Sequence, residues 1–276
     1  CPHLGAHLAH GGRVEQNDVV CPFHGWRWNG GDGRCVAIPY AKRIPPNARL
    51  RAYAVREQNG YAMLWYHARG AAPWFDVPRI PETSDPRFRI YKRMRWELSS
   101  HIQEIYENVV DVQHFRSLHG MDLDRAAWEP VGGPDAPIVR LSLDVRRESR
   151  AQADASGRTE IESLLYGPGL QVTRLSGKLS GVSVNSLTPL GDEKVEVAHT
   201  YYVKSSDPAG EHEVEAFWEY YIADHRLDFQ IWNHKLYRER PVLAENDGDV
   251  AGFRRWFRQF YSGEAAPAGA HRAGAA

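Results

Sequence analysis

The amino-acid sequence predicts an α+β protein, in which a small all-β domain precedes a larger domain of antiparallel strands and helices. Three observations favour this class. The first 72 residues are rich in glycine and short apolar stretches, a proline-rich segment follows at 73–90, and one helical pattern then leads into a long series of strand-like segments. With 276 residues, of which 42% are apolar, the chain can bury a core of this size.

The first domain is expected at 1–72. Segments 51–56 and 60–66 concentrate apolar side chains between turn residues, which indicates two strands. The following segment, 73–90, contains Ala-Pro, Val-Pro, Ile-Pro and Asp-Pro steps and has no periodicity, as is typical of a linker.

The second domain is expected at 91–263. Apolar residues at helical spacing predict a helix over 101–118, and two further helices are expected at about 225–238 and 249–261. The strand-like segments between these helices are 139–145, 160–165, 170–175, 182–187, 195–203 and 214–222. The alanine- and glycine-rich tail, 264–276, is expected to be disordered.

Charge and cysteine content narrow the functional classes. The formal net charge of −1 gives no reason to expect a nucleic acid or an anionic membrane as partner. No apolar run approaches the ~20 residues that span a bilayer. The three cysteines, all within the first 35 residues, are too few for a disulfide framework and predict a reducing, cytoplasmic setting. Because Cys1 would lie inside a metal-binding loop, an upstream segment is expected to be missing, and membrane anchoring by that segment stays open.

Two half-motifs near the start predict a metal site. Cys1-Pro-His3 and Cys21-Pro-Phe-His24 place cysteine and histidine alternately on two loops, with seventeen residues between His3 and Cys21. A zinc finger would instead group two cysteines and then two histidines. The alternation favours a Rieske [2Fe–2S] cluster, in which thiolates hold one iron and imidazoles hold the other. A structural zinc site and ordinary buried side chains are the alternatives.

Other residues of the same types are not expected to bind the cluster. His7 and His10 lack an adjacent cysteine at ligand spacing, and Cys35 is expected to be structural.

A second motif predicts a mononuclear iron site. Asp111, His114 and His119 form the pattern D-x-x-H-x-x-x-x-H. Asp111 and His114 share a face of the expected helix, whereas His119 lies about 140° further around it than His114. Both histidines can reach one metal only if the helix ends or bends before His119, which Gly120 permits. Two imidazoles and one carboxylate form the facial triad of Fe(II) oxygenases. A chance pair of helical histidines is the alternative.

On these two motifs, the chain resembles the α-subunits of Rieske non-haem iron oxygenases over essentially its whole length. The resemblance implies an N-terminally incomplete all-β Rieske domain, followed by a catalytic domain with a helix-grip-like antiparallel sheet and C-terminal helices. It implies that His114 and His119 bind Fe(2+). It also implies that Asp111 bridges one subunit's Rieske histidine to a neighbour's iron-binding histidine within a homotrimer.

The C-terminal region indicates which branch of this family the chain resembles. The segment from Asp228 to the Ile231-Trp232 pair looks like the branch that contains the 3-ketosteroid 9α-hydroxylases and the cholesterol 7-desaturases. This resemblance places the third iron ligand at Asp228, which shares a helix face with Ile231 and Trp232. Asp224, one turn earlier, is the second candidate, and a surface acid at 228 is the structural alternative. His225 is expected on the surface of the helix.

The resemblance implies the terminal oxygenase component of a Rieske-type monooxygenase. Such an oxidoreductase uses O2 and NAD(P)H-derived electrons to hydroxylate or desaturate a bulky apolar, steroid- or sterol-like substrate. The electrons would come from an NAD(P)H-dependent ferredoxin reductase, directly or through a ferredoxin. An aromatic-ring dihydroxylating dioxygenase or an O-demethylase would share every ligand and is the alternative. An electron-transfer protein without oxygenase activity is disfavoured by the length of chain after the cluster domain.

Overall fold

The computed structural model describes residues 1–147, 159–177, 180–205 and 210–263. These residues form two compact units. The first comprises Cys1–Glu57 and Tyr61–Trp74, and the second comprises Gln58–Gly60 and the described residues from Phe75 onward. The tail expected to be disordered, 264–276, lies outside the described residues.

Very short strands build the first unit. Four of them pair in chain order into an antiparallel sheet: β1 (Arg13–Glu15), β2 (Asp18–Val20), β3 (Arg27–Asn29) and β4 (Cys35–Ala37). The strands expected at 51–56 and 60–66 appear as the shorter hairpin of β5 (Val55–Gln58) and β6 (Tyr61–Leu64). Asn59 and Gly60 connect them with positive φ angles of 58° and 78°, the conformation of a tight hairpin turn.

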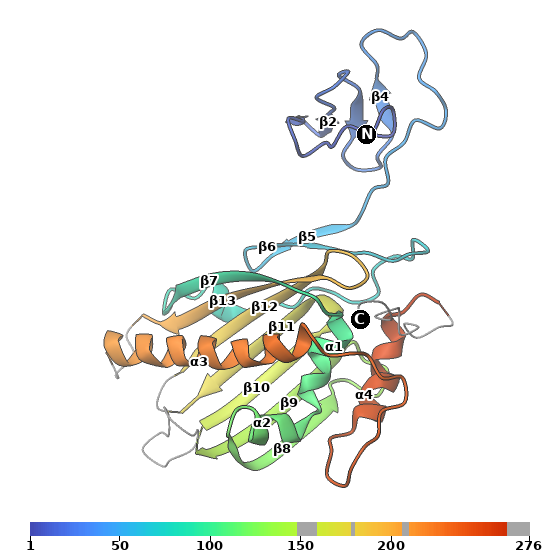
Figure 1. Cartoon of the computed structure of the whole chain (residues 1–276). Helices are drawn as coiled ribbons and strands as arrows, with labels where there is room; N and C mark the ends of the chain where they lie inside the picture. Colours follow the sequence, from blue (N-terminus) through green and yellow to red (C-terminus); the bar gives the residue numbers. More distant parts are fainter. Residues whose placement is uncertain (148–158, 178–179, 206–209, 264–276) are drawn as a thin grey trace. The chain divides into compact units, whose positions relative to one another are not determined.

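A seven-stranded antiparallel sheet dominates the second unit (Figure 1). Its order is β7-β13-β12-β11-β10-β9-β8, so the first strand of the unit lies beside the last. The strands are β7 (Phe88–Leu98), β8 (Asp122–Pro130), β9 (Ile138–Arg147), β10 (Thr159–Tyr166), β11 (Leu170–Ser176), β12 (Gly181–Pro189) and β13 (Val195–Lys204). Five of the six predicted strands are confirmed, and the α+β class with them, whereas β7 and β8 were not expected.

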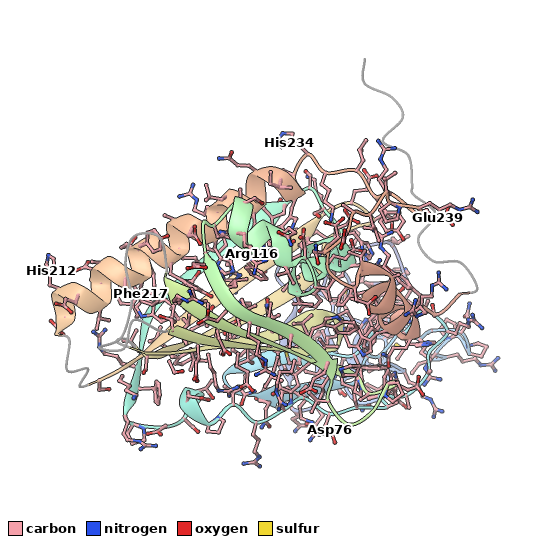
Figure 2. The ribbon with its side chains drawn as sticks, turned by 90° about the horizontal axis from the view of Figure 1, so that it is seen from below. Asp76, Arg116, His212, Phe217, His234 and Glu239 are labelled. Atoms are coloured by element: carbon pink, nitrogen blue, oxygen red, sulfur yellow. The ribbon has the colours of Figure 1, made fainter. Side chains whose placement is uncertain are left out.

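The strand predicted at 214–222 is wrong, because this segment is the first half of the helix α3 (Glu211–Trp232). Its aromatic and branched side chains favour a strand by propensity. However, Val214, Phe217, Trp218 and Ile222 recur at helical spacing and are all buried in the core that α3 forms with the sheet. Figure 1 shows α3 lying across one face of the sheet, and in Figure 2 Phe217 lies on the sheet side of this helix.

The remaining helices pack with α3 around the same core. They are α1 (Ile102–Tyr106), η2 (Glu107–Val109), α2 (Val112–Ser117), α4 (Val250–Phe257) and η4 (Arg258–Phe260). The short turns η1 (Pro81–Thr83) and η3 (Gly167–Gly169) complete the unit. Among the described residues, no helix has the length and apolar character that crossing a bilayer requires.

Candidate metal centres

The four residues predicted to hold a cluster lie on two loops of the first unit. Cys1 and Cys21 both belong to its small core, where Cys21 is only 2% exposed, and neither forms a disulfide. The imidazole rings of His3 and His24 meet edge to face, with centroids 4.8 Å apart. The fold therefore gathers two thiols into one core cluster and brings the two imidazoles into contact.

Local geometry around these residues fits a cluster. Nδ1 of His24 is buried and has no hydrogen-bond partner among the described residues, which is costly unless another group satisfies it. Gly25 turns the second loop with a φ of 69°, and its backbone N–H donates to the Cys21 carbonyl at 3.1 Å. Cys35 is buried and its thiol lies against the carbonyl of Ala37, in agreement with a structural role.

The second candidate centre begins at a break in the helix predicted over 101–118. The break falls at Val110 and Asp111, and Asp111 has a φ of −82° and a ψ of 83°, which are not helical. Its Oδ1 instead accepts a hydrogen bond from the backbone N–H of His114 at 3.2 Å and so caps α2. The expectation that Asp111 and His114 share a face of one continuous helix is therefore wrong.

The C-terminal end of α2 lies before His119, as the sequence predicts. The helix stops at Ser117, and Gly120 has a φ of 66°, so His119 lies beyond the last turn. This ending lets both histidine rings approach each other, with centroids 5.3 Å apart.

His114, His119 and Asp228 converge. One ligand atom from each residue lies within 4.8 Å of the corresponding atoms of the other two. His119 is 7% exposed and Asp228, on α3, is 5% exposed. This set offers two imidazoles and one carboxylate, the donors that Fe(II) takes in a facial triad, so the residues present fit the metal.

Oxygen atoms lie close to three of the four ring nitrogens, although the ring N–H at Nδ1 of His119 is not aligned for a hydrogen bond. Nδ1 of His114 contacts the backbone carbonyl of Asp111, and Nδ1 of His119 lies 2.9 Å from Oδ2 of Asp224. Nε2 of His119 lies 3.3 Å from Oδ2 of Asp228. Metal-binding histidines commonly donate their other N–H to such an acceptor. This geometry favours Asp228 as the third ligand and gives Asp224 the task of orienting His119.

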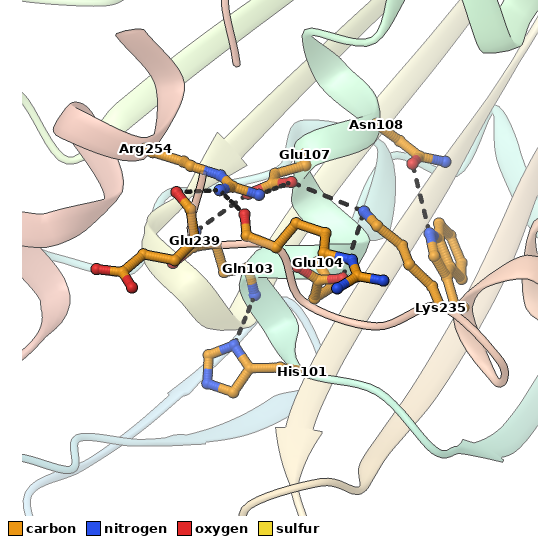
Figure 3. Close-up of polar contacts among 10 residues, drawn as sticks. His101, Gln103, Glu104, Glu107, Asn108, Lys235, Glu239 and Arg254 are labelled. Carbon is orange, nitrogen blue, oxygen red and sulfur yellow. Dashed lines mark hydrogen bonds and ion pairs between the residues drawn. The ribbon is translucent and has the colours of Figure 1, made fainter. Parts of the chain in front are cut away.

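Asn108, which no local sequence pattern marks, orients Asp228. Its Nδ2 donates to Oδ1 of Asp228 at 3.0 Å. Its own Oδ1 accepts from the Trp232 indole at 3.4 Å, a contact drawn in Figure 3. Asn108 and Asp228 are 120 residues apart in the chain, so only the fold reveals the pair.

His225 is not on the surface, contrary to the expectation. Its ring packs against Tyr221 and against His199 of β13, with centroids 4.9 Å and 5.4 Å away. Burial lowers the pKa of His225, and burial together with the neighbouring His225 lowers that of His199 further. Both rings are therefore neutral at pH 7.

A small pocket of about 10 Å³ opens beside His119 and Asp224. Met121, Ile161, Tyr220 and Tyr221 complete its lining. This is about the smallest space that can hold one water molecule, and the walls are mostly apolar and aromatic.

The two candidate iron-binding histidines differ in charge. Burial lowers the pKa of His114, which leaves this ring neutral and ready to bind a metal at neutral pH. Burial also acts to lower the pKa of His119, but the carboxylates of Asp224 and Asp228 outweigh it and raise that pKa to about 9. Without a metal, His119 therefore carries a proton at pH 7.

A metal ion must displace this proton, which makes binding pH-dependent. Below pH 9, we expect the affinity for Co(II) to fall about tenfold for each pH unit, since one proton competes with one ion. Above that pH the affinity should level off. Competition with a chelator from pH 6.5 to 9.5 measures this dependence, and a flat profile between pH 7 and 9 would contradict it.

Comparisons with known proteins agree with the fold. The family model of the 3-ketosteroid 9alpha-hydroxylase C-terminal domain matches residues 64–261, and that of the Rieske [2Fe-2S] domain matches residues 1–54. A cholesterol 7-desaturase of Xenopus laevis is 30% identical over 95% of this chain and 62% of its own length. A probable 3-ketosteroid-9-alpha-monooxygenase oxygenase component of Rhodococcus rhodochrous is 32% identical over 95% of this chain and 69% of its own length. The chain spans about three fifths of the length of the cholesterol 7-desaturases it matches.

Solved structures share the architecture at low identity. Dicamba monooxygenase bound to dicamba superposes with a TM-score of 0.70 and 17% identity, over 94% of this chain and 84% of that chain. The NdmA QL mutant of Pseudomonas putida CBB5 with caffeine gives 0.70 and 18%, over 94% of this chain and 75% of that chain. These likenesses establish the fold, an N-terminal Rieske domain followed by a large antiparallel sheet with helices.

Proposed function

The chain belongs to the Rieske oxygenase family that has the 3-ketosteroid 9α-hydroxylase C-terminal domain, and from this we propose that it is the terminal oxygenase component of a Rieske-type monooxygenase. As a member of this family it carries a [2Fe–2S] cluster and a mononuclear iron. The observation that carries the proposal is the convergence of two histidines and one buried aspartate in a chain that also has the alternating Cys/His loops.

The proposed substrate is a bulky apolar molecule of the steroid or sterol class, which the chain hydroxylates or desaturates. Support comes from the relatives, which are named cholesterol 7-desaturase and 3-ketosteroid-9-alpha-monooxygenase oxygenase component. The electron donor is proposed to be an NAD(P)H-dependent ferredoxin reductase, with or without a ferredoxin. We further propose a homotrimer in the cytoplasm, with the Rieske domain at 1–72, a linker at 73–90 and the catalytic domain at 91–263.

In this proposal, each metal has its own residues and task. Cys1, His3, Cys21 and His24 hold the cluster, which passes electrons one at a time. His114, His119 and Asp228 hold the iron, which supplies reductive activation of O2 when bound.

Neighbouring protein groups orient the side chains that are proposed to bind the iron. The Asp111 carbonyl and the Asp224 carboxylate lie beside Nδ1 of the two histidines, which would leave the Nε2 atoms to hold the metal. Asn108 fixes the carboxylate of Asp228 in the same way. Burial of His119 and Asp228 limits the access of water.

Product analysis tests the proposal. The chain is supplied with NADH, a surrogate reductase and ¹⁸O2, and is incubated with a panel of sterols, 3-ketosteroids and small aromatic compounds. We expect a sterol or steroid to gain one labelled oxygen atom or to lose two hydrogen atoms. Conversion of small aromatic compounds alone, to diols or demethylated products, would overturn the substrate class and favour the dioxygenase or O-demethylase alternative.

Asp111 is proposed to carry electrons from a neighbouring subunit's cluster to this chain's iron. Asparagine caps helices as well as aspartate does, so the change Asp111→Asn should keep α2 intact while removing the charge. We expect unchanged metal content and melting temperature, with turnover reduced about 10- to 100-fold. To measure the transfer step, the cluster is first reduced and then mixed with O2 and substrate in a single turnover. Its visible absorption recovers as it passes its electron on. An unchanged rate of recovery would refute the bridging role.

A further inference from the structure

A group of charged side chains, two of which are buried carboxylates, lies outside the ligand set, between α1, α4 and the segment after α3 (Figure 3). Its members are Glu104, Glu107, Lys235 and Arg254, here called the Glu104–Arg254 cluster. Glu104 and Glu107 are 5% and 6% exposed. Lys235 Nζ lies 3.4 Å from a Glu104 oxygen and 3.7 Å from a Glu107 oxygen, so two carboxylates face two cations.

Arg254 is the centre of this cluster. Its Nε and Nη2 donate to the two carboxylate oxygens of Glu107 at 2.7 Å and 3.1 Å, a two-point contact that lysine could not reproduce. Its Nη1 donates to the backbone carbonyl of Arg238 at 2.5 Å, and its guanidinium lies 4.6 Å from the centroid of the Tyr237 ring. Arg254 of α4 is thereby bonded to η2 and to the segment that follows α3.

Burying charges in this cluster costs free energy of solvation, which stabilisation of the fold alone does not explain. The two buried carboxylates lose their hydration, and well-packed apolar residues of similar size are often at least as stabilising as a buried ion pair. The same α4 and α1 already share an apolar core through Phe253, Trp256 and Phe257, so the charges are not needed to join the helices. A more specific task is therefore expected for them.

The position of the cluster indicates this task. Glu107 directly precedes Asn108, whose side chain donates to the carboxylate of Asp228. Lys235 and Arg238 follow the end of α3, the helix that carries Asp228. The cluster thus holds both partners of the Asn108–Asp228 hydrogen bond, one through η2 and the other through the end of α3.

We infer that Arg254 is a positioning residue of the iron site, which acts through Glu107 to hold Asn108 against Asp228. This inference rests on the proposed function, because it assigns Asp228 to the metal. The residue touches neither metal nor substrate. It fixes the orientation of a carboxylate that would otherwise rotate among several arrangements.

The test compares two neighbouring arginines on the same helix. Arg254→Met removes the contact, and Arg255→Met changes an exposed residue one position away. With Co(II) as the probe, we expect Arg254→Met to weaken binding about 10- to 100-fold, the range for groups that support a metal ligand. Arg255→Met should bind like the unsubstituted chain. The visible absorption of the Rieske cluster, which lies in the other unit, serves as an internal reference for the amount of protein, and the melting temperature of each variant reports the folding of the second unit.

A double-mutant cycle separates positioning from a general effect on stability. If Arg254 acts through Asn108, then Arg254→Met should weaken Co(II) binding no further in a chain that already carries Asn108→Ala. The visible spectrum of bound Co(II) should change alike in both single variants. Fully additive losses, or an unchanged affinity in Arg254→Met, would overturn the inference. If Arg254→Met does not fold, Arg254→Lys and Glu107→Gln take its place, with smaller losses expected in the same cycle.

The unsubstituted chain distinguishes the two levels of the proposal. If it binds no Co(II) at His114 and His119, the iron site itself fails, and the positioning role with it. If it binds Co(II), and the Arg254 variants bind Co(II) with the same affinity, the inference fails and the iron site stands.

Discussion

Replacing Asp228 with alanine is expected to abolish binding of the mononuclear iron while the [2Fe–2S] cluster stays in place. Asp228 supplies the carboxylate of the three-residue group, and its side chain is buried where no water-exposed acid can substitute for it. Two imidazoles alone lack the negative charge and the third donor of a facial triad. We expect a loss of affinity of at least about 100-fold, beyond the range for supporting groups.

Iron quantitation against the cluster's absorbance measures this loss. The unsubstituted chain should contain about three irons and the Asp228→Ala variant about two, since the cluster keeps its own pair. Asp224→Asn is the matched control, one helical turn away. It should retain iron with an affinity lowered about 10- to 100-fold, because it removes only the charge beside Nδ1 of His119. Full iron in Asp228→Ala combined with loss in Asp224→Asn would reverse the ligand assignment.

Replacing Gly248 with alanine is expected to destabilise the second unit by about 3 kcal/mol or more. A Cβ at this position would overlap the backbone carbonyl of Val110, which is fully buried. The Cβ is fixed directly to the backbone and the atoms that it meets are backbone atoms, so no side-chain rotation can relieve the overlap. The change should also disturb the iron site, because Val110 directly precedes Asp111 at the break between the helices. The same loop is joined to α2 by a hydrogen bond from Gln113 to the carbonyl of Asn246.

Denaturant unfolding of the second unit measures this effect, with Co(II) affinity as a second readout. Gly169→Ala is the control, since a Cβ there would lie 3.8 Å from the nearest atom, the carbonyl oxygen of Leu187. This variant should differ from the unsubstituted chain by less than about 1 kcal/mol. Equal stability of the two variants would show that the loop at Gly248 can move away from Val110 without cost.

The parts of the molecule that the sequence predicts well are those whose signal is local. The alternating cysteines and histidines of the two N-terminal loops predict a cluster site through spacing alone, and the fold brings the two imidazoles into contact. Five sheet strands from Ile138 to Lys204 are found because each contains its own apolar run between turn residues. Gly120 likewise marks the end of α2 within the motif that contains both iron-binding candidates.

The features that the sequence does not predict depend on contacts between residues that are far apart in the chain. The segment 214–222 has the composition of a strand, yet the sheet buries its helical face. Asp111 fits the helical pattern of the sequence, but its side chain caps the next helix, α2. Asn108 and His225 acquire their partners, Asp228 and His199, only when α3 docks onto the sheet. No window of sequence contains these contacts.

The residues proposed to hold the iron are separated in the sequence by six of the seven strands of the large sheet. Asp228 follows His119 by 109 residues, and the strands from β8 to β13 all lie between them. Closing such a long loop is slow and requires the intervening strands to pair first. A growing or damaged chain that lacks α3 has two histidines but not the buried carboxylate, and so it has no complete site. The proposed site is therefore complete only when the catalytic fold is complete, and we expect iron to bind only after α3 has docked.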